Sequence, residues 1–301
     1  MTAFRCSVAS AHRGEPMLGT ASGVVRWLLV EQPGPWQAQA PPRGRMAADV
    51  HARAMASAAQ AGARLLAIRR PGRDTPAEHR TVMLADSRIG LERLLARSVD
   101  WDDDLTGLRL PGPTEAPPPP WSQVPEPTFL ACTHGQHDIC CALQGRPIAA
   151  ALAALLPEQT WECSHVGGDR FAGNLIVLPA GHYFGRVDAA AAVQVADAYL
   201  AGRLTSEHLR GRSSLMMPAQ AAQHFARATT GLDGVDDLRP LGVTVLDAHT
   251  WQIRLAVPDG SLEVTVRRRL SDERVLLTCG ADLPQPPPTF ELVHLVAQHR
   301  P

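Results

Sequence analysis

Lysine is absent from the 301-residue chain, and all 29 of its basic residues are arginines. The missing amine excludes mechanisms that need one, such as a lysine Schiff base or the phosphate-binding lysine of a P-loop. The 29 basic and 30 acidic residues give a formal net charge of -1. We therefore expect no global attraction to nucleic acid or to an anionic membrane surface.

Several motifs are also missing. No apolar run approaches the ~20 residues of a membrane span, and the first residues lack the apolar stretch of a secretory signal. Neither the G-x-G-x-x-G fingerprint of a dinucleotide cofactor nor the G-x-S-x-G nucleophile elbow is found. We expect a cytoplasmic protein, in which clustered cysteines more often bind metal or do redox work than form structural disulfides.

Proline marks the clearest boundary in the chain. The segment 111–127 holds eight prolines in 17 residues, which predicts an extended connector because proline fixes φ and removes a backbone donor. This connector separates an α/β N-terminal half, residues 1–110, from a cysteine-rich domain, residues 128–212. The rest of the chain, residues 213–301, is expected to form a small helix and a β-hairpin region.

Hydrophobic periodicity predicts an α/β fold class for both halves. Strands are expected at 24–30, 64–68, 81–84, 128–131, 160–163, 175–178 and 183–187. Helices are expected at 46–62, 91–96, 147–156 and 189–201. The order in the second half is thioredoxin-like, and the first half approximates it, which suggests an internal duplication. The last part is expected to hold a helix at 218–228 and strands at 251–257, 261–267 and 274–278.

Four of the six cysteines lie close together, whereas Cys6 and Cys279 are distant and are expected to be unpaired apolar packers. Two segments, CTHGQHDICC at 132–141 and CSHVGGDRFAGN at 163–174, carry thiols, imidazoles and carboxylates. We expect the first segment to be a loop, and both segments to leave strand ends and meet at one end of the sheet. Thiolate and imidazole are the ligands that zinc, copper and iron–sulfur clusters prefer.

The pairs Cys132-x8-Cys141 and His165-x3-Asp169, within WECSHVGGDRFAGNLIVLP, resemble the sucrase/ferredoxin-like family. The segments VRWLLVEQPGPW, RLLAIRRPGR and LLTCG extend the resemblance over most of the chain. It implies a thioredoxin-like ferredoxin that carries one [2Fe-2S] cluster and serves an unknown redox partner protein. In that family pattern, Cys132 and Cys141 bind one iron, and the positions of His165 and Asp169 bind the other.

The sequence departs from the family pattern at Asp169, where characterised relatives have a second histidine. Three interpretations stay open: Asp169 binds through oxygen, Cys163 replaces it with a thiolate, or there is no cluster. Cys140 is the natural substitute for Cys141, although adjacent side chains normally point apart and both are not expected on one iron. His134 and His137 lie on the same segment, where a solvated histidine is commoner than a ligand.

Three further residues are predicted to contact the cofactor. Gly167 and Gly168 permit close backbone approach or a positive φ, and Arg170 can offset cluster charge as a hydrogen-bond donor around the ligands. An imidazole ligand lowers the negative charge of the cluster, which raises the reduction potential and can couple it to pH. We therefore expect a one-electron carrier or redox sensor.

Two other functions compete with electron transfer. One is a thiol–disulfide oxidoreductase on the same fold, although the chain has no C-x-x-C motif. The other is a structural zinc module with Cys132, Cys141, Cys163 and His165 as ligands. Sucrose hydrolysis is not supported, because a glycosidase needs two carboxylates beside a sugar pocket and the sequence shows no such pair.

Overall fold

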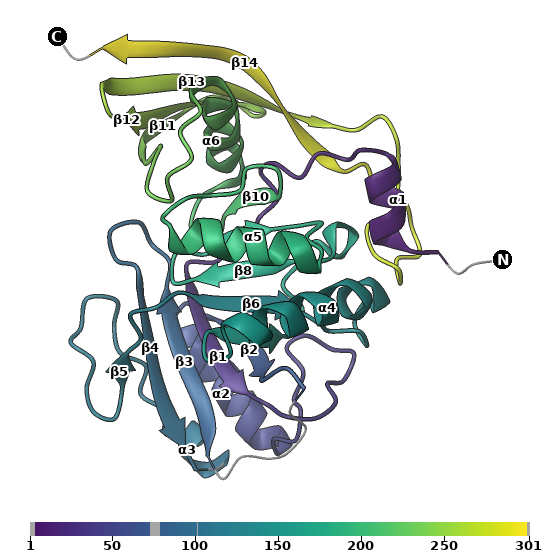
Figure 1. The fold of residues 1–301 in the computed structure, drawn as a ribbon, viewed down its shortest axis with the longest axis vertical. Coiled ribbons are helices and arrows are strands. Elements are labelled where there is room, and N and C mark those ends of the chain that lie inside the picture. Colours follow the sequence, from purple (N-terminus) through teal and green to yellow (C-terminus); the bar gives the residue numbers. More distant parts are fainter. Residues whose placement is uncertain (1–3, 73–78, 101, 300–301) are drawn as a thin grey trace.

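A computed structural model describes residues 4–72, 79–100 and 102–299 of the chain (Figure 1). Its largest element is a ten-stranded mixed sheet with the strand order β10-β9-β8-β6-β7-β2-β1-β3-β4-β5. These strands are β1 (Arg26–Glu31), β2 (Arg64–Arg69), β3 (Arg80–Asp86), β4 (Arg93–Val99), β5 (Ser122–Gln123), β6 (Thr128–Cys132), β7 (Thr160–Cys163), β8 (Leu175–Leu178), β9 (His182–Phe184) and β10 (Leu209–Arg212). The fold is α/β, as the sequence predicts.

Helices cover this sheet and connect its strands. Among the described residues, none of the helices has the length and apolar character needed to cross a membrane. The helices are α1 (Cys6–His12), α2 (Ala48–Gln60), α3 (Asp102–Thr106), α4 (Ile139–Leu155), α5 (Ala189–Leu200) and α6 (Met217–Thr230), with a 3-10 turn η1 (Asp169–Phe171).

The two halves of the large sheet repeat one arrangement. In the first half, β1 pairs in parallel with β2 and antiparallel with β3, and β3 pairs antiparallel with β4. In the second half, β6, β7, β8 and β9 pair in the same way. Helix α2 connects the parallel pair of the first half, and α4 connects that of the second. The shared order supports the predicted internal duplication of a thioredoxin-like unit.

The halves join through a very short antiparallel ladder between β2 and β7. It consists of the pairs Ile68↔Cys163 and Arg69↔Glu162, at the carboxyl ends of both strands. The neighbouring registers Glu31↔Ile68 and Cys132↔Cys163 extend this contact into one row across four strands. The carboxyl ends of all four strands therefore meet in the middle of the sheet, and the segments that follow them lie near this junction.

Two predicted helices differ from those observed. Residues 91–96, predicted as helical, form no helix, and 93–96 belong to strand β4, because pairing with β3 along seven residues overrides the helix propensity of the run LERLLA. Helix α4 begins at Ile139 rather than at Pro147, which lies inside it. Asp138 is the reason for the early start: its side chain caps the helix by accepting a hydrogen bond from the Cys140 amide at 2.9 Å.

The last part of the chain forms a second sheet with the order β11-β12-β13-β14, against which α6 packs (Figure 1). The predicted hairpin is confirmed as β12 (Thr250–Val257) and β13 (Gly260–Leu270). Hydrophobic periodicity did not predict the two outer strands, β11 (Pro240–Asp247) and β14 (Pro288–His299). The strand predicted at 274–278 is wrong, since this segment makes only an isolated bridge between Val275 and Gln285.

Candidate metal centre

The cysteine-bearing segments leave strand ends and meet, as the sequence predicts, but they meet at the junction of the two sheet halves rather than at one end of the sheet. Cys132 is the last residue of β6 and Cys163 the last of β7, and the two are paired in register. Cys141 lies in the first turn of α4, so the first segment is a loop only as far as the cap at Asp138. All three thiols are buried.

Close packing of α4 on β6 brings Cys141 to Cys132. At Gly145 a side chain would put its Cβ 2.0 Å from the Cys132 carbonyl oxygen, so only glycine permits this approach. Hydrogen bonds from the thiols of Cys141 and Cys163 hold the pKa of Cys132 well below its usual range. The pKa of Cys141 is raised by its hydrogen bond to Cys132 and by burial, and burial raises that of Cys163.

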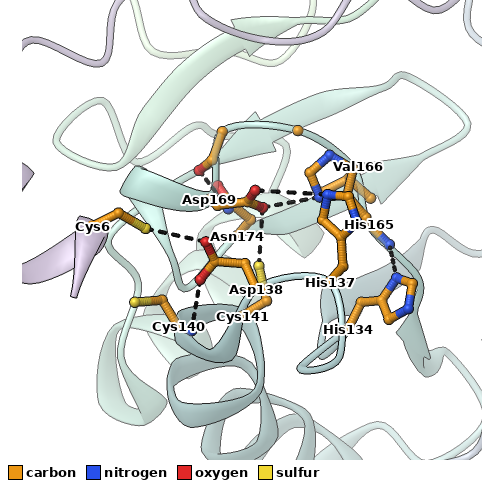
Figure 2. A network of polar contacts seen from close by, with 12 residues as sticks. Cys6, His134, His137, Asp138, Cys140, Cys141, His165, Val166, Asp169 and Asn174 are labelled. Carbon is orange, nitrogen blue, oxygen red and sulfur yellow. Dashed lines mark hydrogen bonds and ion pairs between the residues drawn. The ribbon is translucent and has the colours of Figure 1, made fainter. Parts of the chain in front are cut away.

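Asp169 and His165 lie beside Cys141 (Figure 2). Asp169 Oδ1 is 3.2 Å from Cys141 Sγ and 2.9 Å from His165 Nδ1. The contact between Asp169 Oδ1 and His165 Nδ1 does not have the geometry of a hydrogen bond. Among the residues that the structure describes, His165 Nδ1 and Asp169 Oδ2 are both buried without a hydrogen-bond partner. A bound cation would satisfy both atoms, because buried polar groups are normally paired or coordinate a metal.

A buried arginine holds the turn that carries Asp169. Gly167 and Gly168 have φ values of +95° and +78°, in the left-handed region that favours glycine. Arg210 donates from Nη1 to the Gly167 carbonyl at 3.1 Å and to Asn174 Oδ1 at 2.7 Å. Asn174 in turn donates to the Gly168 carbonyl at 2.9 Å. Burial lowers the pKa of Arg210 to about 10.

Sequence reasoning missed Arg210 entirely. Its neighbours in LRGR give no local signal, and only the fold brings β10 to the glycine turn. Arg170, predicted to donate toward the cofactor, forms an ion pair with the buried Glu15, whose Oε1 lies 2.5 Å from Arg170 Nε. Arg170 also lies 4.3 Å above the Phe171 ring.

The two other histidines near the site, His134 and His137, make different contacts with His165. His134 is buried, and its Nε2 donates to the Gln37 carbonyl at 2.6 Å while its Nδ1 accepts from the His165 amide at 3.2 Å. Burial lowers the pKa of His134, and with both ring nitrogens engaged it positions His165. His137 packs its ring 3.9 Å from that of His165 and brings Nε2 within 4.0 Å of Asp169 Oδ2.

Among the residues that the structure describes, two groups of side chains have donor atoms spaced closely enough to hold a metal ion. One consists of His137, His165 and Asp169; the other consists of Cys6, Asp138, Cys140 and Cys279. All six cysteines are free, as expected for Cys6 and Cys279, but these two are not isolated packers. Cys140, the alternative to Cys141 in the sequence analysis, lies in the second group. The adjacent thiols therefore do point apart, as expected.

Comparison with known proteins gives one match. A family model described as sucrase/ferredoxin-like matches residues 17–211, which include nearly the whole large sheet and the first of the two groups. Cys6 and Cys279, of the second group, lie outside the matched residues. No curated protein and no solved structure matches the chain.

Proposed function

The chain belongs to the sucrase/ferredoxin-like family, and on that premise we propose that it is a one-electron transfer protein with a [2Fe-2S] cluster. Cys132 and Cys141 would hold one iron, and His165 and Asp169 the other. When bound, the cluster supplies reversible one-electron chemistry. The observation that carries the proposal is the gathering of two buried thiols with a His–Asp pair, of which His165 Nδ1 and Asp169 Oδ2 have no hydrogen-bond partner among the described residues.

The contacts of Asp169 favour it over Cys163 as the fourth ligand. Asp169 Oδ1 contacts both Cys141 Sγ and His165 Nδ1. Cys163 instead forms its thiol contact with Cys132, and its pKa is raised by burial. The donor set also suits the chemistry, because thiolate and imidazole are established ligands of such clusters.

One edge of the site is open enough to exchange electrons with a redox partner protein. The side chains of His137 and His165 are 31% and 17% exposed, whereas Asp169 is 2% exposed. A neighbouring groove of about 470 Å³ is lined by Trp36, Arg69, His134, Leu143 and Arg146, among others. We place the docking of the unknown partner there, and its arginines favour an acidic surface. Free thiols suit the reducing cytoplasm.

The decisive test is the colour of the full chain purified without oxygen. We expect visible absorption with about two irons and two sulfides per chain, and its complete loss in Cys132→Ser. The matched control is Ile68→Val, a buried change in the same row of the sheet, which keeps the absorption and costs about 1 kcal/mol of unfolding free energy. Full absorption in Cys132→Ser contradicts the proposed ligand set.

Separate substitutions identify the fourth ligand. Asp169→Asn should remove or shift the visible bands, whereas Cys163→Ser should leave them unchanged. A redox titration of the unsubstituted protein should give a potential above the approximately −400 mV of plant-type ferredoxins, with a dependence on pH. A value near −400 mV that does not vary with pH argues against imidazole ligation.

A structural zinc module with Cys132, Cys141, Cys163 and His165 as ligands is the second candidate, because the thiols of Cys141 and Cys163 both contact that of Cys132. Two of these ligands, His165 and Cys141, also lie 2.9 and 3.2 Å from Asp169 Oδ1. A colourless protein containing zinc at this site would favour that module. Thiol–disulfide exchange is disfavoured by the complete burial of Cys132 and Cys163. A colourless, metal-free protein would support it instead.

A further inference from the structure

Three cysteines from distant parts of the chain converge at the amino end of α4. Cys6 is the first residue of α1, Cys140 lies in the first turn of α4, and Cys279 lies between β13 and β14. The cap residue Asp138 completes the group. Figure 2 shows Cys6, Cys140 and Asp138 together on the side of the helix end that faces away from His165. Cys6 and Cys140 are buried, and Cys279 is half-buried.

The spacing of the four donor atoms matches a site for one ion. Cys279 Sγ lies 3.4 Å from Cys140 Sγ and 3.6 Å from Cys6 Sγ. Cys6 Sγ lies 3.5 Å from Asp138 Oδ2, and all four donors are within 4.8 Å of one another. With Zn–S bonds of about 2.3 Å and Zn–O bonds of about 2.0 Å, a tetrahedral site has S–S edges of about 3.8 Å and S–O edges of about 3.5 Å.

Asp138 is oriented as a metal-binding carboxylate would be. Its Oδ1 accepts from the Cys140 amide at 2.9 Å, and its Oδ2 accepts from the Cys279 amide at 2.7 Å. Such hydrogen bonds fix the direction of a ligating carboxylate. Asp138 is 3% exposed, and no arginine or histidine in the described part of the chain forms an ion pair with it. The two amide hydrogen bonds and the amino end of α4 partly offset the cost of burying this carboxylate, and a bound cation would offset it further.

We propose that Cys6, Cys140, Cys279 and Asp138 bind one zinc-class divalent cation. Binding would release the three thiol protons to solvent and leave three thiolates and one carboxylate on the metal. The ion would fasten α1 and the segment around Cys279 to the first turn of α4, which also carries Cys141. This site does not depend on the proposed cluster, since it shares no ligand with it.

A disulfide explains the group less well. The sulfur–sulfur distances of 3.4 and 3.6 Å are well beyond the disulfide length of about 2.05 Å. A disulfide between any two of the cysteines would also leave the third sulfur and the buried carboxylate without a role. A single soft cation uses all four donors at once.

The test measures zinc in the full chain, purified without oxygen and without chelator, by elemental analysis and zinc X-ray absorption. We expect an environment of three sulfurs and one oxygen, with Zn–S bonds of about 2.3 Å. The zinc content should fall by one ion per chain in Cys279→Ser and in Cys6→Ser. Thr278→Ser, the adjacent position on the same segment, is the matched control and keeps the full zinc content.

Two further variants keep the result interpretable. Cys279→His supplies another zinc ligand and should restore the ion if the serine variant fails to fold. Cys132→Ser should lose the visible absorption and retain the zinc of this group, which separates the two proposals. Zinc content that is unchanged in both Cys6→Ser and Cys279→Ser overturns the inference. A mass 2 Da below that of the reduced chain, which marks a disulfide among the three cysteines, also overturns it.

Discussion

The two halves of the large sheet share one strand order and differ at the ends of their parallel strands. In the row that crosses the junction, the first half contributes Glu31 and Ile68 where the second half contributes Cys132 and Cys163. The backbone arrangement is therefore insufficient to make a metal centre. The chemistry resides in the residues at two strand ends and in the segments that follow them.

The first half takes another role, which is to cover the centre built by the second. After β1 the chain turns at Trp36, whose ring packs edge-on against His134 at 5.8 Å between centroids. The next residues offer carbonyl oxygens, from Gln37 to His134 and from Ala38 to His137. One copy of the unit thus supplies the donor atoms, while the other restrains the imidazoles beside them.

The largest expected effect follows from substituting the buried arginine of each half, which should destabilise both halves but change the site in only one. Arg210 holds the glycine turn of the site, and Arg26 in the first half donates to Ala61 and Pro111 carbonyls and lies 3.3 Å from Asp86. Arg210→Met and Arg26→Met should each lower the unfolding free energy by about 3–5 kcal/mol, because both leave buried acceptors unpaired. Urea unfolding measures this loss.

Only Arg210→Met should also lower the ratio of visible absorption to protein, because Arg26 does not contact the site. Equal loss of absorption in the two variants would mean that the first half supports the centre as directly as the second.

Substituting two tryptophans that are buried to a similar extent tests whether the first half covers the metal centre. Trp36 packs on His134, and Trp121 packs at the far side of the first half with its indole donating to the Arg109 carbonyl. Each change to alanine should cost about 3 kcal/mol. Trp36→Ala should in addition speed the bleaching of the visible bands in air, because it exposes the imidazoles, whereas Trp121→Ala should bleach at the unsubstituted rate.

The smallest expected effect concerns pH. Burial holds the pKa of His182, in the second half, well below its usual range, and lowers that of the half-buried His51 in the first. Below pH ~6.5 the unfolded chain takes up a proton that the folded chain does not, so stability falls as pH decreases toward the folded pKa, by at most about 1.4 kcal/mol per pH unit for each group. His182→Gln should flatten this decline in urea unfolding between pH 7.5 and 5.5 more than His51→Gln does. A steeper decline in His182→Gln would contradict the assigned direction.

Most of the strands around the site, and the motif residues in it, could be predicted from the sequence because they depend on local sequence patterns. Short apolar runs bounded by glycine and proline correctly predicted β1, β2, β6, β7 and β8. The motif residues Cys132, Cys141, His165 and Asp169 lie at the junction of the two sheet halves. The failures come from tertiary contacts. Residues 91–96 are helical by propensity, and only pairing with β3 makes 93–96 part of a strand.

Other features could not be found from spacing at all. Arg210 reaches the glycine turn only because β10 joins the edge of the sheet, and nothing near it in the sequence signals that contact. Cys6 and Cys279 are 273 positions apart, and no periodicity links them. The orientation of Asp138 likewise depends on an amide from that distant segment.

The separation of Cys6 from Cys279 has a consequence for biosynthesis. Chains emerge from the ribosome amino end first, at about 5–20 residues per second, so Cys6 and Cys140 are made well before Cys279. The contacts at Cys279, which close a loop of more than two hundred residues, can form only after β13 has been translated. The group of Cys6, Cys140 and Cys279 is thus completed only once three strands of the second sheet have been synthesised.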